Sequence, residues 1–228
     1  MCGRFTLAAD ASDVMDTFSV EDMHYEHAPR YNIAPSQTIA VINNNNGRRV
    51  LDGYRWGLVP RWVKDIKIGF SMINARAETL DTKPAYRNLV AKNRVVIPAD
   101  GFYEWLKEDD GKQPYRFVLK EQGVFGFAGL YDEWADSKGN ILRSCNIITT
   151  QPNELVQSVH DRMPVILEKD VVDEWLDPGI TKTEHVLEML RPYPAGLMNS
   201  YPVSKAVGNV RFTDAGLIEE VPLTLSEL

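Results

Sequence analysis

The stretch from residue 94 to residue 150 constrains the fold most, because five apolar segments rich in β-branched and aromatic residues follow one another there. Polar, turn-forming residues separate most of these segments. Short strands at this spacing predict an antiparallel sheet or barrel and disfavour alternating βαβ units. The segments read RVVIPAD, GFYEWLKE, YRFVLKE, VFGFAGLYDEW and ILRSCNIITT, and the turns read DDGKQ, EQG and DSKGN.

The rest of the chain predicts a hairpin, a loop, several helices and a late strand. TIAVI and RRVLDGYRW flank NNNNG, whose Asn-Gly step is typical of a tight hairpin turn. RYNIAPSQ predicts a loop and NSYPVSKAV a strand. Helices are predicted for ADASDVMDTF, PAYRNLVAKN, PNELVQSVH, EKDVVDEWL and TKTEHVLEML. No repeat or linker divides the sequence. We therefore expect residues 1–228 to form one α+β domain, a barrel-like mixed sheet of mainly antiparallel strands with peripheral helices.

The composition excludes several classes of protein. Two cysteines, Cys2 and Cys145, are too few for a disulfide framework or a cysteine-rich zinc site, and Cys145 lies in an apolar stretch expected in the core. No cluster with metal-ligand spacing accompanies them, so we expect neither metal nor cofactor. No apolar run approaches the roughly 20 residues that span a bilayer, and no secretory signal begins the chain. A cytoplasmic protein without a membrane partner is expected.

The charges are unevenly distributed along the chain, whose net charge is −7. Eleven basic and four acidic side chains lie between Arg48 and Arg94, which leaves 14 basic and 28 acidic side chains for the rest. This basic segment suggests a local anion-binding face, although charges scattered over unrelated surfaces would give the same count. Trp56 and Trp62 lie within it. Each could stack on the bases of a single strand or belong to the core.

Cys2 has a distinctive chemistry if Met1 is removed, as is usual before a small second residue. The new N-terminus would carry an amine with a pKa of about 7.7–8.0, against about 10.4 for lysine, and a thiol beside it. Neighbouring cations such as Arg4 could favour the thiolate. The amine can form a Schiff base with an aldehyde, and the thiol can then close a thiazolidine ring. Only a 1,2-aminothiol does this.

Other polar residues could move protons or orient a substrate. Glu104 shares its face of an alternating strand with apolar neighbours, so desolvation should raise its pKa toward neutrality; a salt-bridged or exposed glutamate is the alternative. His160 lies where a helix gives way to HDRMP, and a catalytic or a structural role is open. Asn74 and Arg76, two residues apart, would offer an orienting amide and a phosphate clamp on one face of an extended segment.

Six motifs, in order, resemble the SRAP (SOS-response-associated peptidase) family: MCGRF, RYNIAPSQ, WGLVPRW, INARAET, IPADGFYEW and HDRMP. The resemblance implies a single SRAP-type domain that recognises abasic sites in single-stranded DNA and crosslinks to them. It implies that Cys2 is the covalent nucleophile and that the active site is completed by Asn74, Glu104 and His160. It also implies DNA contacts by Arg4, Pro35, Trp62 and Arg76.

Joined to the residue chemistry, the resemblance suggests a mechanism. His160 assists opening of the abasic sugar while Asn74 orients it, the Cys2 amine forms the Schiff base with Glu104 shuttling protons, and the thiol closes a thiazolidine that shields the lesion. Slow closure would allow β-elimination and weak lyase activity. We expect a monomer that associates with the nucleoid when it is bound to DNA.

Two other functions compete with this interpretation. An N-terminal-nucleophile peptidase or amidase could use Cys2, Asn74 and His160 on an amide, including self-processing of the N-terminus. A noncatalytic single-strand binder would tolerate the loss of Cys2. The basic, aromatic-bearing segment favours a DNA substrate, because an amidase has no need of it.

Overall fold

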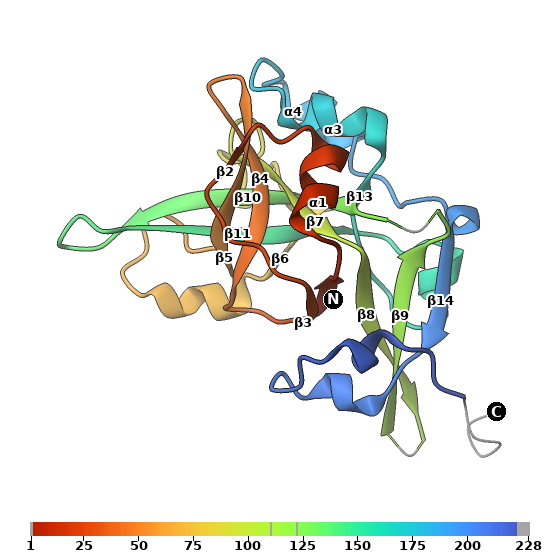
Figure 1. Ribbon diagram of the computed structural model, residues 1–228. Helices are drawn as coiled ribbons and strands as arrows, with labels where there is room; N and C mark the ends of the chain where they lie inside the picture. The colour runs from red at the N-terminus through yellow and green to blue at the C-terminus, as the bar shows by residue number, and fades with distance from the viewer. Residues whose placement is uncertain (1, 110, 122, 223–228) are drawn as a thin grey trace.

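The predicted strands are present and form two sheets, with the helices around them (Figure 1). The structure, a computed structural model, describes residues 2–109, 111–121 and 123–222. The larger sheet has the strand order β12-β11-β10-β7-β4-β5-β2, with β13 on β10 and β6 on β11. Its strands are β2 (Asp22–Met23), β4 (Thr38–Asn45), β5 (Arg48–Trp56), β6 (Asn74–Arg76), β7 (Arg94–Ala99), β10 (Phe125–Ala135), β11 (Ile141–Thr150), β12 (Met163–Pro164) and β13 (Ile166–Leu167).

The larger sheet closes on itself. From β11 through β10, β7 and β4 to β5, each strand pairs with the next in antiparallel fashion. β5 then pairs with β11 in parallel, with Cys145 opposite Trp56. These five strands therefore form a ring with a mixed pattern of pairing, which confirms the predicted α+β fold with a barrel-like mixed sheet.

The smaller sheet carries the N-terminus. Its order is β14-β9-β8-β1-β3. The strands are β1 (Phe5–Leu7), β3 (Arg30–Ile33), β8 (Gly101–Glu108), β9 (Gly111–Leu119) and β14 (Met198–Pro202). Phe5 joins the two sheets, since its ring centroid lies 5.2 Å from that of Trp56 on β5 and 5.8 Å from that of Phe127 on β10. The first strand is thus packed between the sheets.

The helices are short and peripheral (Figure 1). Val14 and Phe18 are the buried residues of the first. None of the helices in the described ranges is long and apolar enough to cross a membrane. The α-helices are α1 (Ala11–Phe18), α2 (Glu154–Gln157), α3 (Lys169–Leu176) and α4 (Thr183–Glu188), and the 3₁₀ helices are η1 (Ile66–Ser71), η2 (Ala77–Thr79), η3 (Ala195–Leu197), η4 (Lys205–Gly208) and η5 (Ala215–Ile218).

The hairpin between β4 and β5 turns as predicted. Asn46 and Gly47 at its tip have φ values of 53° and 87°, the left-handed conformation that a tight Asn-Gly turn requires.

Three local predictions were wrong. PAYRNLVAKN forms a series of turns and not a helix. In a helix every backbone amide donates to the carbonyl oxygen four residues back, whereas here only the amides of Arg87, Val90 and Asn93 do so. Packing of the buried Leu89 and Val90 overrides helix propensity here. RYNIAPSQ begins as strand β3, because β1 offers it a pairing edge. In NSYPVSKAV the strand ends at Pro202, and residues 205–208 form η4.

Candidate active site

Cys2 lies just before β1 and is fully buried. Its thiol approaches the carbonyl oxygen of Arg4 at 3.9 Å, and that same oxygen accepts a hydrogen bond from the amide of Tyr103 on β8. The N-terminal segment therefore runs along β8, the strand that carries Glu104. Burial, and next the negative charge of Glu104, raise the pKa of the Cys2 thiol. The expectation that a cation such as Arg4 would favour the thiolate was therefore wrong.

Glu104 lies in the middle of β8 and is 2% exposed. The predicted alternation is confirmed, since Phe102 belongs to the main core and Tyr103 to a separate cluster on the other face. Burial raises the pKa of Glu104 to about 7. A carboxyl group with such a pKa is populated in both its acid and its base form at neutral pH. The predicted desolvation of this side chain is thus present.

His160 follows α2 and faces Glu104. Its Nε2 lies 3.9 Å from Oε2 of Glu104. Its Nδ1 accepts a hydrogen bond of 3.0 Å from the amide of Arg162, so the neutral ring carries its proton on Nε2. Nδ1 also lies 3.0 Å from the carboxylate of Asp161, whose side chain is 87% exposed and therefore well screened by water. Burial lowers the pKa of His160, which favours the neutral ring.

Arg162 is a residue of this region that sequence reasoning missed. Its guanidinium makes a bidentate pair with Glu78, at 2.7 and 2.9 Å, and donates to the carbonyl oxygen of Thr149 at 2.7 Å. Glu78 lies in η2, directly after β6, so this pair ties the His160 loop to the segment that carries Asn74. An arginine between an aspartate and a methionine in HDRMP gave no signal that it would be buried.

Asn74 begins β6, where it pairs in register with Ile147 of β11. Its Nδ2 lies 3.5 Å from the Ile147 carbonyl oxygen, and its backbone carbonyl accepts from the Tyr86 hydroxyl at 3.4 Å. Its Oδ1 is buried and has no hydrogen-bond partner within the described part of the chain. A buried acceptor without a partner is costly, so this oxygen is a candidate contact for a ligand.

The Arg4 guanidinium is held by partners that are distant in the chain. Its Nη1 donates to Oδ1 of Asn32 at 2.7 Å and to the carbonyl oxygen of Val207 at 2.6 Å, and its Nη2 to that of Gly208 at 3.2 Å. Burial lowers its pKa. Arg4 therefore holds the N-terminal segment against the chain near residue 208.

The other predicted DNA contacts lie on separate surface segments. Pro35 is half-buried in the turn after β3, and Arg76 at the end of β6 is exposed. Trp62 is 54% exposed and lies on the surface, whereas Trp56 is fully buried and belongs to the core.

The loop that carries Trp62 is anchored at two points on β10. Asp132, which is fully buried, accepts from the amide and from Nε of Arg61, both at 2.9 Å. The Trp134 indole donates to the Val63 carbonyl oxygen at 2.8 Å. The exposed ring of Trp62 is therefore presented by a fixed loop.

The basic segment is only partly available to an anion. Arg94 is buried, which corrects its inclusion in an anion-binding face. Arg48, Arg49 and Arg61 form ion pairs with carboxylates. The exposed cations of the segment that form no ion pair with another described residue are Lys64, Lys67, Arg76, Lys83, Arg87 and Lys92.

The structure thus brings Cys2, Glu104 and His160 together and connects them to Asn74 through Arg162. In the residues it describes, no group of three or more His, Cys, Asp or Glu side chains could hold a metal ion. The arrangement offers a proton donor and acceptor, an imidazole and a sulfur nucleophile in a buried setting.

Glu104 should make the fold less stable above neutral pH. Its pKa is raised on folding from 4.5 to about 7, so the folded protein binds the proton more tightly, and its stability falls as pH rises from 4.5 to 7. We expect Glu104→Gln to raise the free energy of unfolding by about 3 kcal/mol at pH 8 and by little at pH 4.5. Urea unfolding of both proteins at the two pH values measures this, and an equal effect at both would contradict it.

Comparison with known proteins gives consistent findings. The family model described as SOS response associated peptidase (SRAP) matches residues 1–210. The abasic site processing protein YoqW of Bacillus subtilis (strain 168) is 46% identical over 222 residues, which is 96% of this chain and 99% of that protein. The abasic site processing protein YedK of Escherichia coli (strain K12) is 30% identical over 97% of this chain and 100% of that protein. The crystal structure of a protein from Bacteroides thetaiotaomicron matches with a TM-score of 0.87 at 25% identity. The match covers 97% of this chain and 100% of that protein.

Proposed function

Because the chain belongs to the SOS response associated peptidase family, we propose that it recognises abasic sites in single-stranded DNA. We propose further that it binds them covalently through Cys2. Its relatives in Bacillus subtilis and Escherichia coli are named abasic site processing proteins. The protein acts without a cofactor, as a monomer, in the cytoplasm and on DNA. Removal of Met1 exposes the Cys2 amine, which is the first nucleophile.

The observation that carries this proposal is the buried, neutral thiol of Cys2 beside a carboxyl group with a pKa of about 7. A cysteine peptidase needs a thiolate for the first attack, and burial opposes it. An α-amine needs no such activation, because its ordinary pKa of about 7.7–8.0 leaves a usable neutral fraction at pH 7. The thiol then acts second, within one molecule, where proximity compensates for its protonated state.

Every proton in the reaction has a donor and an acceptor. Opening of the sugar hemiacetal moves the proton of its hydroxyl to the ring oxygen, and the Nε2 proton of His160 is suited to assist. The amine adds to the aldehyde carbon, and one of its protons moves to the new alkoxide oxygen. Glu104 in its acid form protonates the resulting hydroxyl, which leaves as water, and the Glu104 carboxylate then takes the remaining nitrogen proton, so that an imine remains. The thiol sulfur adds to the imine carbon and its proton passes to the nitrogen, which closes the thiazolidine. Oδ1 of Asn74, buried without a partner among the described residues, accepts from a sugar hydroxyl.

The test uses a single-stranded oligonucleotide with one abasic site, incubated without a reductant. We expect an adduct that survives heat and denaturant, and none with a tetrahydrofuran analogue that lacks the aldehyde. An amide substrate that releases product, with no adduct on abasic DNA, would favour the N-terminal-nucleophile amidase. Reversible binding alone would favour a noncatalytic binder.

Trp62 should contribute to DNA binding without stabilising the fold. Because its ring is exposed on an anchored loop, we expect Trp62→Ala to weaken binding of the tetrahydrofuran oligonucleotide by about 1–3 kcal/mol at constant salt and to leave the free energy of unfolding unchanged. Leu197→Ala removes a comparably exposed apolar side chain, 51% against 54%, and serves as the matched control. Equal affinities for the two variants, measured by fluorescence anisotropy, would exclude a stacking role for Trp62.

A further inference from the structure

Strand β1, which leads from Cys2 into the fold, has few ladder contacts of its own. It is three residues long. It pairs with β8 through Phe5↔Phe102 and Thr6↔Gly101, and its register with β3 is irregular between Phe5 and Leu7. A strand so short is poorly defined in register by its backbone alone.

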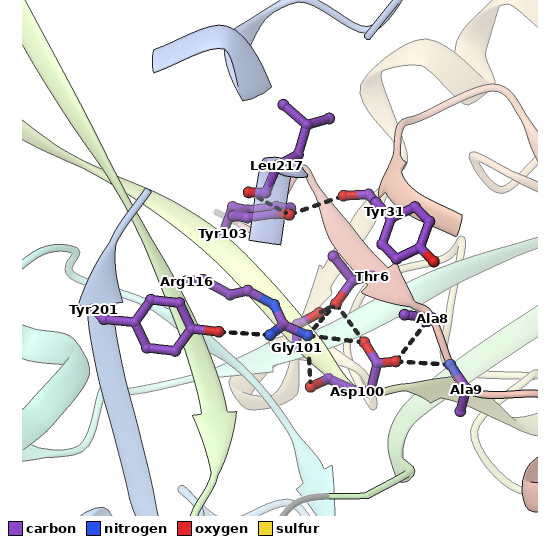
Figure 2. Close-up of polar contacts among 10 residues, drawn as sticks. All are labelled: Thr6, Ala8, Ala9, Tyr31, Asp100, Gly101, Tyr103, Arg116, Tyr201 and Leu217. Carbon is purple, nitrogen blue, oxygen red and sulfur yellow. Dashed lines mark hydrogen bonds and ion pairs between the residues drawn. The ribbon is translucent and has the colours of Figure 1, made fainter. Parts of the chain in front are cut away.

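The Asp100 carboxylate supplies the missing anchor (Figure 2). Its Oδ1 accepts from the Thr6 hydroxyl, and its Oδ2 accepts from the backbone amides of Ala8 and Ala9. Its own amide donates to the Thr6 carbonyl oxygen at 2.9 Å. One side chain thus holds Thr6 of β1 and the two backbone amides that follow the strand.

Arg116 on β9 fixes this carboxylate from the other side (Figure 2). Its Nη2 donates to Oδ1 of Asp100 at 3.1 Å and to the Thr6 hydroxyl at 3.0 Å, and its Nη1 donates to the Tyr201 hydroxyl at 2.7 Å. The Arg116 and Asp100 side chains are only 9% and 13% exposed. A Cβ at position 101 would lie 2.6 Å from Nε of Arg116, so a glycine is needed there for the guanidinium to reach Asp100.

We propose that Asp100, held by Arg116, is a positioning residue for the reaction at Cys2. Asp100 immediately precedes β8, and Glu104 lies on that same strand. The clamp therefore sets the register of β1 against the strand that carries Glu104. A slip of one residue would turn the N-terminal side chains to the other face of the sheet. This inference rests on the proposed function, since it concerns the rate of crosslinking.

Two variants weaken the clamp by different means. Asp100→Asn keeps the shape but presents an NH₂ group, so it faces either the two amides that follow β1 or Arg116 with a donor instead of an acceptor. Thr6→Val removes one hydroxyl and leaves the carboxylate in place. Arg94→Lys is the control for Arg116→Lys, because both arginines are buried, with 6% and 7% of the whole residue exposed. Arg94 binds the carbonyl oxygens of residues 90, 91, 175 and 177, outside the candidate active site.

The experiment measures adduct formation in a single turnover with saturating abasic single-stranded DNA. A misplacement of about 1 Å costs up to about 100-fold in rate, so we expect at least a tenfold lower rate constant for Asp100→Asn and a smaller loss for Arg116→Lys and Thr6→Val. Affinity for the tetrahydrofuran oligonucleotide should stay within about twofold, because Trp62 and Arg76 lie on segments that the clamp does not touch. Amide hydrogens of residues 7–9 should exchange faster in Asp100→Asn and not in Arg94→Lys.

Several results would overturn the proposal. A wild-type rate for Asp100→Asn would do so, as would an equal loss of rate in Arg94→Lys, which would indicate general destabilisation. If Asp100→Asn does not fold, Thr6→Val and Arg116→Lys test the same inference by the same criteria. If the wild-type protein forms no adduct, the proposed function itself is wrong. A positioning role for that reaction is then wrong as well, even if hydrogen exchange shows that Asp100 holds the residues after β1 in place.

Discussion

Cys2→Ala is expected to abolish the heat-stable adduct with abasic single-stranded DNA. The amine of the new N-terminal residue can still form an imine, but no sulfur is present to close a ring. An imine hydrolyses or undergoes β-elimination, so the yield of adduct without reductant should fall by at least about 100-fold. Denaturing gels of heated samples measure this yield.

Borohydride separates the amine from the thiol. Because it reduces an imine to a stable amine, Cys2→Ala should become trapped on abasic DNA when the reductant is present. Cys2→Ser, the closest matched variant, should give an adduct that is less stable than that of the wild type, and more strand cleavage. A short N-terminal extension that cannot be removed blocks the amine and leaves the thiol, and it should prevent adducts with and without borohydride. Heat-stable adducts of Cys2→Ala without reductant would disprove the aminothiol mechanism.

Glu104→Gln should slow crosslinking by about 100-fold or more at neutral pH, the range typical of losing a general acid and base. The glutamine keeps the size and polarity of the protonated glutamic acid, and the buried environment is preserved. The loss therefore reports proton transfer rather than packing. Single-turnover rates with saturating abasic DNA provide the measurement.

The pH profile of the reaction should carry the signature of Glu104. Its acid form is lost as pH rises past about 7, whereas the neutral fraction of the Cys2 amine increases through its pKa, so the wild-type rate should pass through a maximum near neutrality. Glu104→Gln should lose the falling limb and rise continuously. Glu108→Gln, on the same strand, should keep the wild-type profile. A maximum that persists in Glu104→Gln would assign the acid to another group.

Much of the fold and of the buried carboxyl group could be predicted from the sequence. The turn-separated apolar segments gave the antiparallel strands, because alternation and turn chemistry are local properties. The same alternation identified Glu104 as a carboxyl group among apolar neighbours, and its burial on β8 agrees. The Asn46-Gly47 turn was equally local.

The remaining features depend on partners that are distant in the chain. The sequence around Arg4 does not indicate that its partner is Val207. The sequence around Arg94 does not indicate that this side chain is buried against the end of α3. Trp56 and Trp62 lie six residues apart in one motif, yet one is core and the other is surface. Tertiary packing determines whether such a side chain is buried and which residue it contacts. The periodicity of the sequence does not indicate either.

The bond between Arg4 and the Val207 carbonyl oxygen spans 203 residues of sequence. The segment that bears Cys2 is therefore completed by chain synthesised 203 residues later, and a pairing of this kind forms late because loop closure must precede it. On the ribosome, a nascent chain would lack the fully anchored site until residues near 208 had emerged. The segment that bears Cys2 would thus leave the ribosome well before it becomes competent.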